Sequence, residues 1–212
     1  MFSKTGSLKF ISHLDTIRVI TRAIRRSGIK IAYTKGFRKR PKIAFGPPLP
    51  LGVSGEKEYF DLFFEVPFAG DVVSIMNKVL PEGIKILDAK PVFIKDPSIS
   101  KIVSLLKYRI SPLQVDRKMV EKIMRSEHIL VTRQRGNDNI EIDIRPYIHS
   151  LVNGDDHVDV LVRFLPEGSI RIEELFSLLG IEKGEVLTVD RVGIYAEQEG
   201  ELAELLKTEK SL

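Results

Sequence analysis

The spacing of hydrophobic residues predicts short strands and helices that alternate along the whole chain. Apolar residues recur every three to four positions in four segments, which is the period of a helix with one buried face. These predicted helices span residues 12–27, 69–80, 116–126 and 172–179. Alternating or continuous apolar runs predict strands between them. The first is a short strand within residues 1–11 that is interrupted by a break at Gly6, and the others are at residues 29–33, 42–45, 58–65, 84–93, 103–110, 128–134, 140–144, 158–165 and 186–195.

The first helix has the clearest boundaries. Ser12 is a good N-cap residue with Asp15 three positions later, a variant of the capping box, and Gly28 is a typical C-terminal stop. At 100° per residue, arginines form one stripe beside an apolar face. The stripe contains Arg18, Arg22 and Arg25, with Arg26 at its edge, and the apolar face contains Leu14, Ile17, Ile20, Thr21 and Ile24.

Apart from one additional short strand in each half, the order of these elements is β-α-β-β-α-β, and it occurs twice. This order is that of the split-βαβ plan. We therefore expect an α+β protein made of two tandem ferredoxin-like (βαββαβ) halves, with mainly antiparallel sheets and helices on one face. The expected domains are residues 1–96 and 97–197, followed by a polar tail at 198–212 that forms a marginal helix or frays.

The charge of the chain is concentrated in one segment. Residues 16–55 contain ten Lys or Arg residues and no Asp or Glu, which leaves 23 basic and 29 acidic residues elsewhere out of totals of 33 and 29. A local excess of one charge indicates what the protein binds and does not indicate its fold. Neighbouring arginines repel each other, and no acid inside the segment relieves that repulsion, so an external anion is a reasonable ligand.

RNA fits this segment better than duplex DNA does, because the sequence has no helix-turn-helix or comparable groove reader. Lys and Arg neutralise phosphates, and the aromatic rings of Tyr33 and Phe37 lie among them in the sequence, where they could stack on unpaired bases. The alternatives are an acidic protein surface or an anionic membrane. The predicted nucleic-acid-binding residues are Arg18, Arg22, Arg25, Arg26, Lys35, Phe37, Arg38, Lys39, Arg40 and Lys42.

A second hypothesis gives the same region a catalytic role. His13 lies at a helix start, where the macrodipole disfavours the charged imidazole, and a neutral imidazole can act as a general base. Together with Tyr33 and the cluster Arg38–Arg40, it could support metal-independent RNA cleavage. The simpler interpretation is that His13 packs against or caps the helix.

The residue types exclude several other classes of function. The chain has no cysteine and its four histidines form no close pair, so we expect neither a metal site nor any other cofactor. There is no P-loop, dinucleotide-binding or metalloprotease motif. No apolar run is long enough to cross a membrane and the first residues do not resemble a signal peptide, so we expect a cytoplasmic protein.

The basic segment ends in an apolar, proline-rich stretch, Phe45–Val53. Its prolines cannot donate hydrogen bonds to a sheet ladder, so it is not a central strand. We expect an extended, rigid element that packs through Leu49, Leu51 and Val53. A third hypothesis follows, in which this stretch and a free sheet face dock a protein partner.

Several strings in the first third of the chain, taken together, resemble one bacterial family. They are Phe2–Gly6, Leu8–Asp15, Arg22–Gly28, Gly36-Phe37, Phe45–Val53 and Glu58-Tyr59. In this order they are similar to the radical SAM-linked protein family, a domain of unknown function. Where its members usually carry Asn-Pro-His-Pro after Gly-Phe, this chain has Arg38-Lys39-Arg40-Pro41, so a second histidine is missing and positive charge is added.

The resemblance implies a partner and a role. Members occur fused to or encoded beside a radical SAM protein, which would be the enzyme, because this chain lacks the cysteines of the cluster motif. We therefore expect a non-catalytic accessory protein, an adaptor that binds RNA or a ribosomal substrate for a radical SAM protein. The tandem fold with a basic face also resembles that of CRISPR repeat-processing endoribonucleases, which is an analogy of fold alone.

Overall fold

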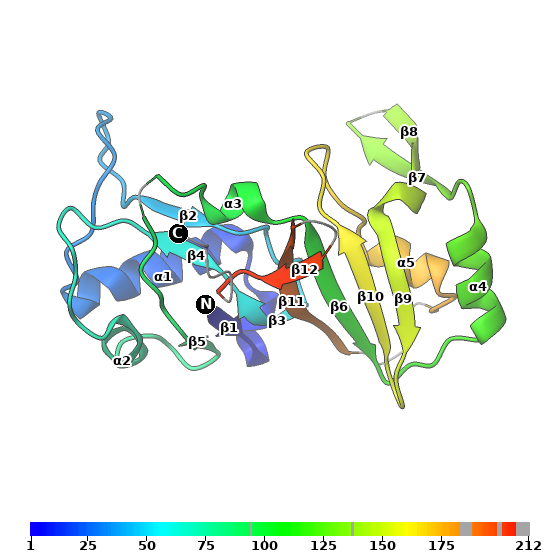
Figure 1. Cartoon of the computed structure of the whole chain (residues 1–212), viewed down its shortest axis with the longest axis horizontal. Helices are drawn as coiled ribbons and strands as arrows, with labels where there is room; N and C mark the ends of the chain where they lie inside the picture. The colour runs from blue at the N-terminus through cyan, green and yellow to red at the C-terminus, as the bar shows by residue number, and fades with distance from the viewer. Residues whose placement is uncertain (94, 137, 183–187, 199–200, 207–212) are drawn as a thin grey trace. The chain divides into compact units, whose positions relative to one another are not determined.

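The computed structural model of the chain is α+β, with short helices and antiparallel strand pairings. It describes residues 1–212 except 94, 137, 183–187, 199–200 and 207–212. The chain forms two compact units (Figure 1). Unit 1 consists of Met1–Val103 and Ala196–Leu212, and unit 2 is Ser104–Tyr195. The domain ranges 1–96 and 97–197 stay a prediction about independent folding, for which limited proteolysis is the test.

Unit 1 is built around one long helix, and its core lies between that helix and a three-stranded sheet of order β5-β1-β3. A separate antiparallel pair, β2–β4, packs its Phe45 and Phe60 rings 5.4 Å apart. The elements are β1 (Phe2–Lys4), the 3-10 helix η1 (Gly6–Phe10), α1 (His13–Ser27), β2 (Ile43–Phe45), β3 (Ser54–Glu58), β4 (Phe60–Leu62), α2 (Val72–Asn77), β5 (Ile84–Ile86), α3 (Ile99–Ile102) and β12 (Glu201–Glu204).

Unit 2 has an antiparallel sheet of order β11-β6-β10-β9. Its core strand β10 is buried at Val158, Val160 and Val162. The hairpin β7–β8 forms a sheet of its own. The elements are β6 (Leu105–Ser111), α4 (Arg117–Arg125), β7 (Leu130–Arg135), β8 (Asp138–Asp143), the 3-10 helix η2 (Arg145–Tyr147), β9 (Ile148–Asn153), β10 (Val158–Arg163), α5 (Ile172–Leu178) and β11 (Thr188–Gln198), whose last residues belong to unit 1.

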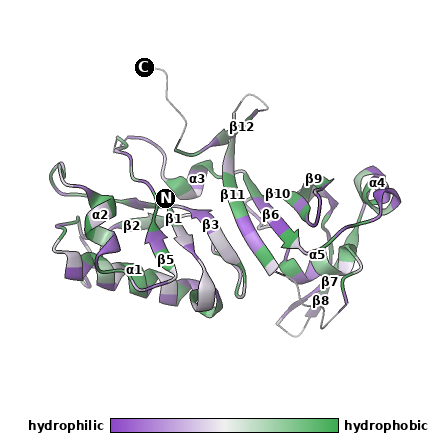
Figure 2. Ribbon diagram, turned by 90° about the horizontal axis from the view of Figure 1, so that it is seen from below, coloured by the Kyte–Doolittle hydropathy of each residue, from purple (hydrophilic) through white to green (hydrophobic). Residues whose placement is uncertain are grey.

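The predicted caps of α1 are confirmed. Ser12 accepts a hydrogen bond from the backbone N–H of Asp15 at 3.1 Å, and Gly28 ends the helix in the left-handed conformation with φ of 73°. Such a conformation is free of steric cost only for glycine. Figure 2 shows hydrophobic and hydrophilic residues along the length of α1, which is typical of a helix with one face on a core.

The predicted apolar face of α1 is wrong at its start. Ile20 and Ile24 are buried as expected, together with Ala23, but Leu14 is 64 % exposed. At 100° per residue, Leu14 is only about 20° from Arg25 and about 80° from Ile24. The helix therefore turns Leu14 toward the arginine side, and the buried face is centred near Ile20, with Thr16, Ala23 and Ile24 on either side of it.

Two predicted strands of unit 1 have a different form. The segment expected as a strand at residues 29–33 forms no regular strand in the described structure. It has an isolated bridge between Tyr33 and Pro41 and single backbone hydrogen bonds at Ala32, and Ile29 and Ile31 are buried in the core. The expected buried strand at 58–65 divides into β3 and β4, which belong to different sheets. The chain changes partner on either side of Tyr59, because Glu58 pairs with Phe2 of β1 and Phe60 pairs with Phe45 of β2.

Three more elements of unit 1 differ from the prediction: α2, β5 and the C-terminal tail. The second predicted helix and the strand that follows it are shorter than expected, at Val72–Asn77 and Ile84–Ile86. The polar tail, expected as a marginal helix or frayed, contains the strand β12, which pairs with β11. Lys57 in β3 forms a salt bridge with Glu204 at 2.9 Å, which holds this strand within unit 1.

Candidate nucleic-acid interface

Helix α1 presents three arginines as one exposed stripe. Arg18, Arg22 and Arg25 are exposed and lie within about 60° of each other around the helix axis. The buried side chains on the opposite side fix this orientation, because Ile20 and Ile24 are at most 1 % exposed. The predicted stripe is therefore present, and it extends for about two turns toward the C-terminal end of the helix.

The arginines of α1 differ in their partners. Arg18 forms an exposed salt bridge with Asp15 at 2.7 Å, and hydrogen bonds from Ser12 and then from Arg18 lower the pKa of Asp15. Arg26 donates a hydrogen bond to the carbonyl of Val79 at 2.7 Å, so it holds α1 to the segment after α2. Arg22 and Arg25 have no salt bridge or side-chain hydrogen bond within the described part of the chain.

The segment after α1 forms a projecting hairpin, here called the arm (residues 32–42). The backbone N–H of Thr34 donates to the carbonyl of Arg40 at 2.9 Å, and that of Lys42 donates to the carbonyl of Ala32 at 2.8 Å. Figure 1 shows this blue segment as a narrow extension from unit 1. Its tip is Lys35-Gly36-Phe37-Arg38-Lys39. The backbone hydrogen bonds below the tip make this segment a hairpin.

The arm exposes an aromatic ring among cations. Phe37 is fully exposed, at 106 % of its reference area, and it contacts no core residue in the described structure. Lys35, Arg38 and Lys39 have no acidic partner among the described residues. Lys42, at the base of the arm, is less free, because its ammonium group lies 4.5 Å from the centroid of the Phe63 ring.

An open groove of about 400 Å³ joins the helix to the arm. Arg25 contributes from α1 and Tyr33 from the base of the arm, and Glu65 comes from the segment after β4. The groove is completed by Gly28, Ile29, Lys30 and Ile31. The groove thus adjoins the last arginine of the stripe, Arg25, and the base of the arm at Tyr33.

Sequence analysis missed Lys30 and Glu65 as site residues. A signal for Lys30 was present, because it is exposed between two buried isoleucines, Ile29 and Ile31, and such alternation points the middle residue outward. No signal marked Glu65, since its position beside the groove depends on the path of the chain after β4.

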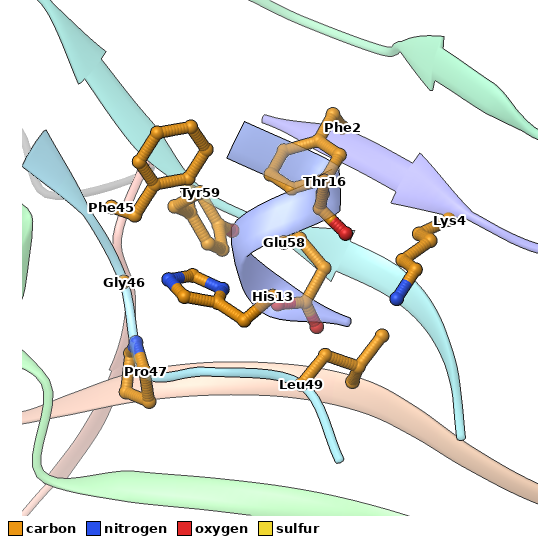
Figure 3. A pocket seen from close by; sticks show the side chains of 10 residues that line it. All are labelled: Phe2, Lys4, His13, Thr16, Phe45, Gly46, Pro47, Leu49, Glu58 and Tyr59. Carbon is orange, nitrogen blue, oxygen red and sulfur yellow. The ribbon is translucent and has the colours of Figure 1, made fainter. Parts of the chain in front are cut away.

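His13 lies at the other end of α1, in a small pocket with room for about one water molecule (about 10 Å³). Its ring makes an edge contact with Phe45, at 5.7 Å between centroids. Figure 3 shows the amine of Lys4 and the carboxylate of Glu58 on the same side of the pocket, with the His13 ring nearer Phe45 and Pro47. Lys4 and Glu58 are 1 % and 4 % exposed, and Lys4 donates to the carbonyl of Ile11 at 2.8 Å.

Neighbouring residues are adapted to this buried polar cluster. A Cβ on Gly55 would lie 2.6 Å from Cγ of Glu58, so the strand needs glycine there to make room for the carboxylate. The structure does not bring His13 and Tyr33 together. His13 is the first residue of α1, whereas Tyr33 lines the groove beyond its last residue, and a 15-residue helix is about 22 Å long.

The proline-rich stretch is largely a packing element, as predicted. Leu49 and Val53 are buried, at 8 % and 2 % exposed, and Pro47 is also buried. Leu51 is the exception, at 67 % exposed, because it lies at a turn that ends at Gly52, which has φ of 80°. Gly52 donates to the carbonyl of Lys9 at 2.9 Å, which brings Leu51 near Phe10, itself 62 % exposed.

Comparison with known proteins gives a family and no activity. Residues 1–177 match a family described as an uncharacterized protein conserved in bacteria (DUF2344). No curated protein matches the chain. Within the described residues, no helix is long and apolar enough to span a membrane. Since the match covers most of the 212 residues, including α1, the arm and the groove, the chain belongs to this bacterial family of uncharacterized proteins.

Proposed function

We propose that this protein binds RNA through a cationic surface formed by the arginine stripe of α1, the groove and the arm. One observation carries the proposal. Five exposed cations, Arg22, Arg25, Lys35, Arg38 and Lys39, have no acidic partner among the described residues. Charges of one sign held close together repel each other, and phosphates bound there would relieve the repulsion while releasing counterions.

The arm favours single-stranded RNA over a duplex. An exposed ring such as that of Phe37 gains free energy by stacking on an unpaired base. Bases inside a duplex are already stacked on their neighbours, so the Phe37 ring could stack only on the terminal base pairs. The short tip with its neighbouring Arg38 and Lys39 would contact the phosphates on either side of the stacked base.

The fold is consistent with such a role. In unit 2, the strand order β11-β6-β10-β9 and the helices α4 and α5 between its strands support a ferredoxin-like half with β7–β8 inserted. In unit 1, the β5-β1-β3 sheet with α1 and α2 supports a second half that lacks one strand of the plan. We propose the tandem ferredoxin-like description on this basis.

The direct test is binding of a fluorescent 20-nucleotide single-stranded RNA, followed by anisotropy at several salt concentrations. Replacing Arg22, Arg25, Arg38 and Lys39 by Gln should lower affinity about 100-fold at low salt and reduce the slope of log K against log salt by about 3. A matched variant removes four exposed cations of α4, namely Arg117, Lys118, Lys122 and Arg125, and should change affinity less than threefold.

Two results would overturn the proposal. The first is an absence of binding to this RNA at 50 mM salt. The second is an equal loss of affinity in the two variants, since equal loss would mean that net charge matters and the surface does not. Duplex DNA of the same length serves as the competitor, and it should displace the RNA only at higher concentration.

The adaptor role needs a second surface for a protein. The resemblance to radical SAM-linked proteins suggests a radical SAM protein as that partner. Two apolar side chains of unit 1, Phe10 and Leu51, are more than 60 % exposed. The turn that carries Leu51 lies against the Phe10 ring, because a Cβ on Gly52 would be 3.8 Å from that ring, and an exposed apolar patch is typical of a protein contact. We propose that this side of unit 1 contacts the partner.

Co-purification from cells tests the adaptor role. A partner that remains bound after nuclease treatment is held by protein contacts, and Phe10→Ser with Leu51→Ser should release it without weakening RNA binding. If a radical SAM protein is recovered only before nuclease treatment, RNA bridges the two proteins. The proposed direct contact between them would then be wrong.

The alternative of a metal-independent endoribonuclease has less support, because His13 and Tyr33 lie at opposite ends of α1. His13 would have to act with Lys4 and Glu58, which are buried. Incubation of the labelled RNA with the protein in EDTA is the discriminating experiment. Cleavage that disappears in His13→Ala would favour the endoribonuclease over the adaptor.

A further inference from the structure

The groove at the C-terminal end of α1 combines cations, a carboxylate and an aromatic ring on one open surface. It has two cations, Arg25 and Lys30, one carboxylate, Glu65, and one aromatic ring, Tyr33. Its apolar residues Ile29 and Ile31 belong to the core of unit 1, so the groove rests on a rigid part of the fold. Its volume of about 400 Å³ is in the range of small-molecule sites.

The opposite charges of this groove do not neutralise each other. Within the described residues, Glu65 forms no salt bridge with Arg25 or Lys30, although all three line the same groove. A carboxylate is also unfavourable beside a phosphate path, because like charges repel. A ligand that fits the whole groove therefore needs an anionic group for the cations and hydrogen-bond donors for the carboxylate.

A nucleotide whose base carries hydrogen-bond donors on its edge has both the anionic group and the donors. Its phosphate suits Arg25 and Lys30, its base can stack on Tyr33, which is 40 % exposed, and its Watson–Crick edge can reach Glu65. An ionised carboxylate only accepts hydrogen bonds, through two oxygens side by side. Guanine presents two adjacent donors, N1–H and N2–H, that match this pair of oxygens. Uracil presents one donor between two carbonyl acceptors, which repel the second oxygen.

We propose that this groove is a base-reading subsite for one unpaired guanine in the bound RNA, with Glu65 as the specificity-determining residue. This inference rests on the proposed RNA binding and adds sequence preference to it. The arginine stripe and the arm then supply affinity that is independent of sequence, while the groove sets the register of the strand.

The experiment compares two labelled 12-nucleotide RNAs, oligo(U) and oligo(U) with one central guanosine. The guanosine should raise affinity about tenfold, which is the effect of a good bidentate contact. Inosine in its place, which lacks the N2 amino group, should give an intermediate affinity. Glu65→Gln should remove the preference and bind oligo(U) at least as tightly as the wild type, since a repulsive charge is gone.

A matched variant, Glu82→Gln, changes an exposed carboxylate of unit 1 outside the groove and should keep the tenfold preference. Equal affinity of the wild type for the two RNAs, or a preference that survives in Glu65→Gln, would overturn the inference and leave RNA binding intact. Absence of binding to both RNAs at low salt would overturn the proposed function itself.

A competition experiment distinguishes a nucleotide from another ligand that carries both a positive and a negative charge. Free glycine carries a carboxylate and an ammonium group and could bridge the same residues. If millimolar glycine displaces the guanosine-containing RNA and guanosine monophosphate does not, the groove belongs to an amino acid, and the inference fails. Displacement by guanosine monophosphate and not by uridine monophosphate supports it.

Discussion

Basic residues serve different purposes in the two units. In unit 2, Arg133 makes a double hydrogen bond with Glu174 at 2.6 and 2.8 Å and a third with the carbonyl of Ser169, and the Arg133 and Glu174 side chains are each 11 % exposed. In unit 1, Arg22 and Arg25 are exposed and have no such partner among the described residues. The residue types are the same, and the surroundings decide whether a cation stabilises the fold or remains available to a ligand.

A second pair of examples supports this contrast. Asp159 on β10 lies opposite Arg109 on β6 and forms salt bridges with Arg109 and Lys107, each at 2.8 Å. Burial acts to raise the pKa of Asp159, but the two cations outweigh it and hold the pKa at about 2. Lys107, Arg109 and Arg133 of unit 2 are therefore neutralised by acids of the same unit, whereas Lys35, Arg38 and Lys39 of the arm have no acidic partner among the described residues.

The largest expected effect concerns Arg133. Arg133→Ala should lower the free energy of unfolding by about 3 kcal/mol, because it leaves the carboxylate of Glu174 buried without its partner. Urea unfolding of the full chain followed by circular dichroism measures this loss. Arg38→Ala in the arm is the comparison and should stay within about 0.5 kcal/mol of wild type. If the two variants are equally stable, the proposed difference between Arg133 of unit 2 and Arg38 of the arm is wrong.

A medium effect is expected for Asp143, which accepts hydrogen bonds from the backbone of Ile129 and Arg145 and from His128. The backbone hydrogen bond from Ile129 contributes most, and together they lower the pKa of Asp143 from 3.8 to about 2. Asp143→Asn should cost about 1 kcal/mol at pH 7.

The pH dependence sharpens this prediction. A lowered native pKa stabilises the fold above pH 4, where the carboxylate is ionised in both states, and the contribution is lost as pH falls toward 2. The stability difference between wild type and Asp143→Asn should therefore be full at pH 7 and smaller at pH 3, measured by urea unfolding at each pH. A difference that does not change with pH would mean that the charge of Asp143 has no role.

The smallest effects come from two adjacent arginines of α1. Arg26→Ala should cost about 0.5–1 kcal/mol of stability, through the lost hydrogen bond to Val79, and should leave RNA affinity unchanged. Arg25→Ala should leave stability unchanged and lower RNA affinity about fivefold, as for one lost phosphate contact. If both variants lose only affinity, the assignment of Arg26 as a structural residue is wrong.

The sequence predicted local structure well where local interactions decide it. Ser12 and Gly28 set the ends of α1 through contacts with residues a few positions away. In unit 2, the helical period predicted α4 and alternating apolar residues predicted β6 and β10, whereas β9 (Ile148–Asn153) was not predicted as a strand. The orientation of α1 was less predictable. Leu14 fits an apolar face by residue type, but the buried face is centred near Ile20 and includes Thr16 and Ala23, and such polar or small side chains carry little weight in a hydrophobic pattern.

Long-range pairing explains what the sequence did not predict. The segment at residues 29–33 alternates like a strand, yet the backbone N–H of Ala32 donates to Phe63 at 2.7 Å, and regular pairing goes no further. Whether such a segment finds a partner depends on strands far away in the chain. For the site, the cations were predictable from charge alone, whereas Glu65 enters the groove only through the tertiary path after β4.

The arm has one consequence for how proteins of this family can diverge. Its tip, from Lys35 to Lys39, lies outside the core cluster of unit 1, so substitutions there change the free energy of folding little. Evolution can therefore exchange the chemistry of the tip freely, and the same scaffold can acquire new ligands without first acquiring extra stability.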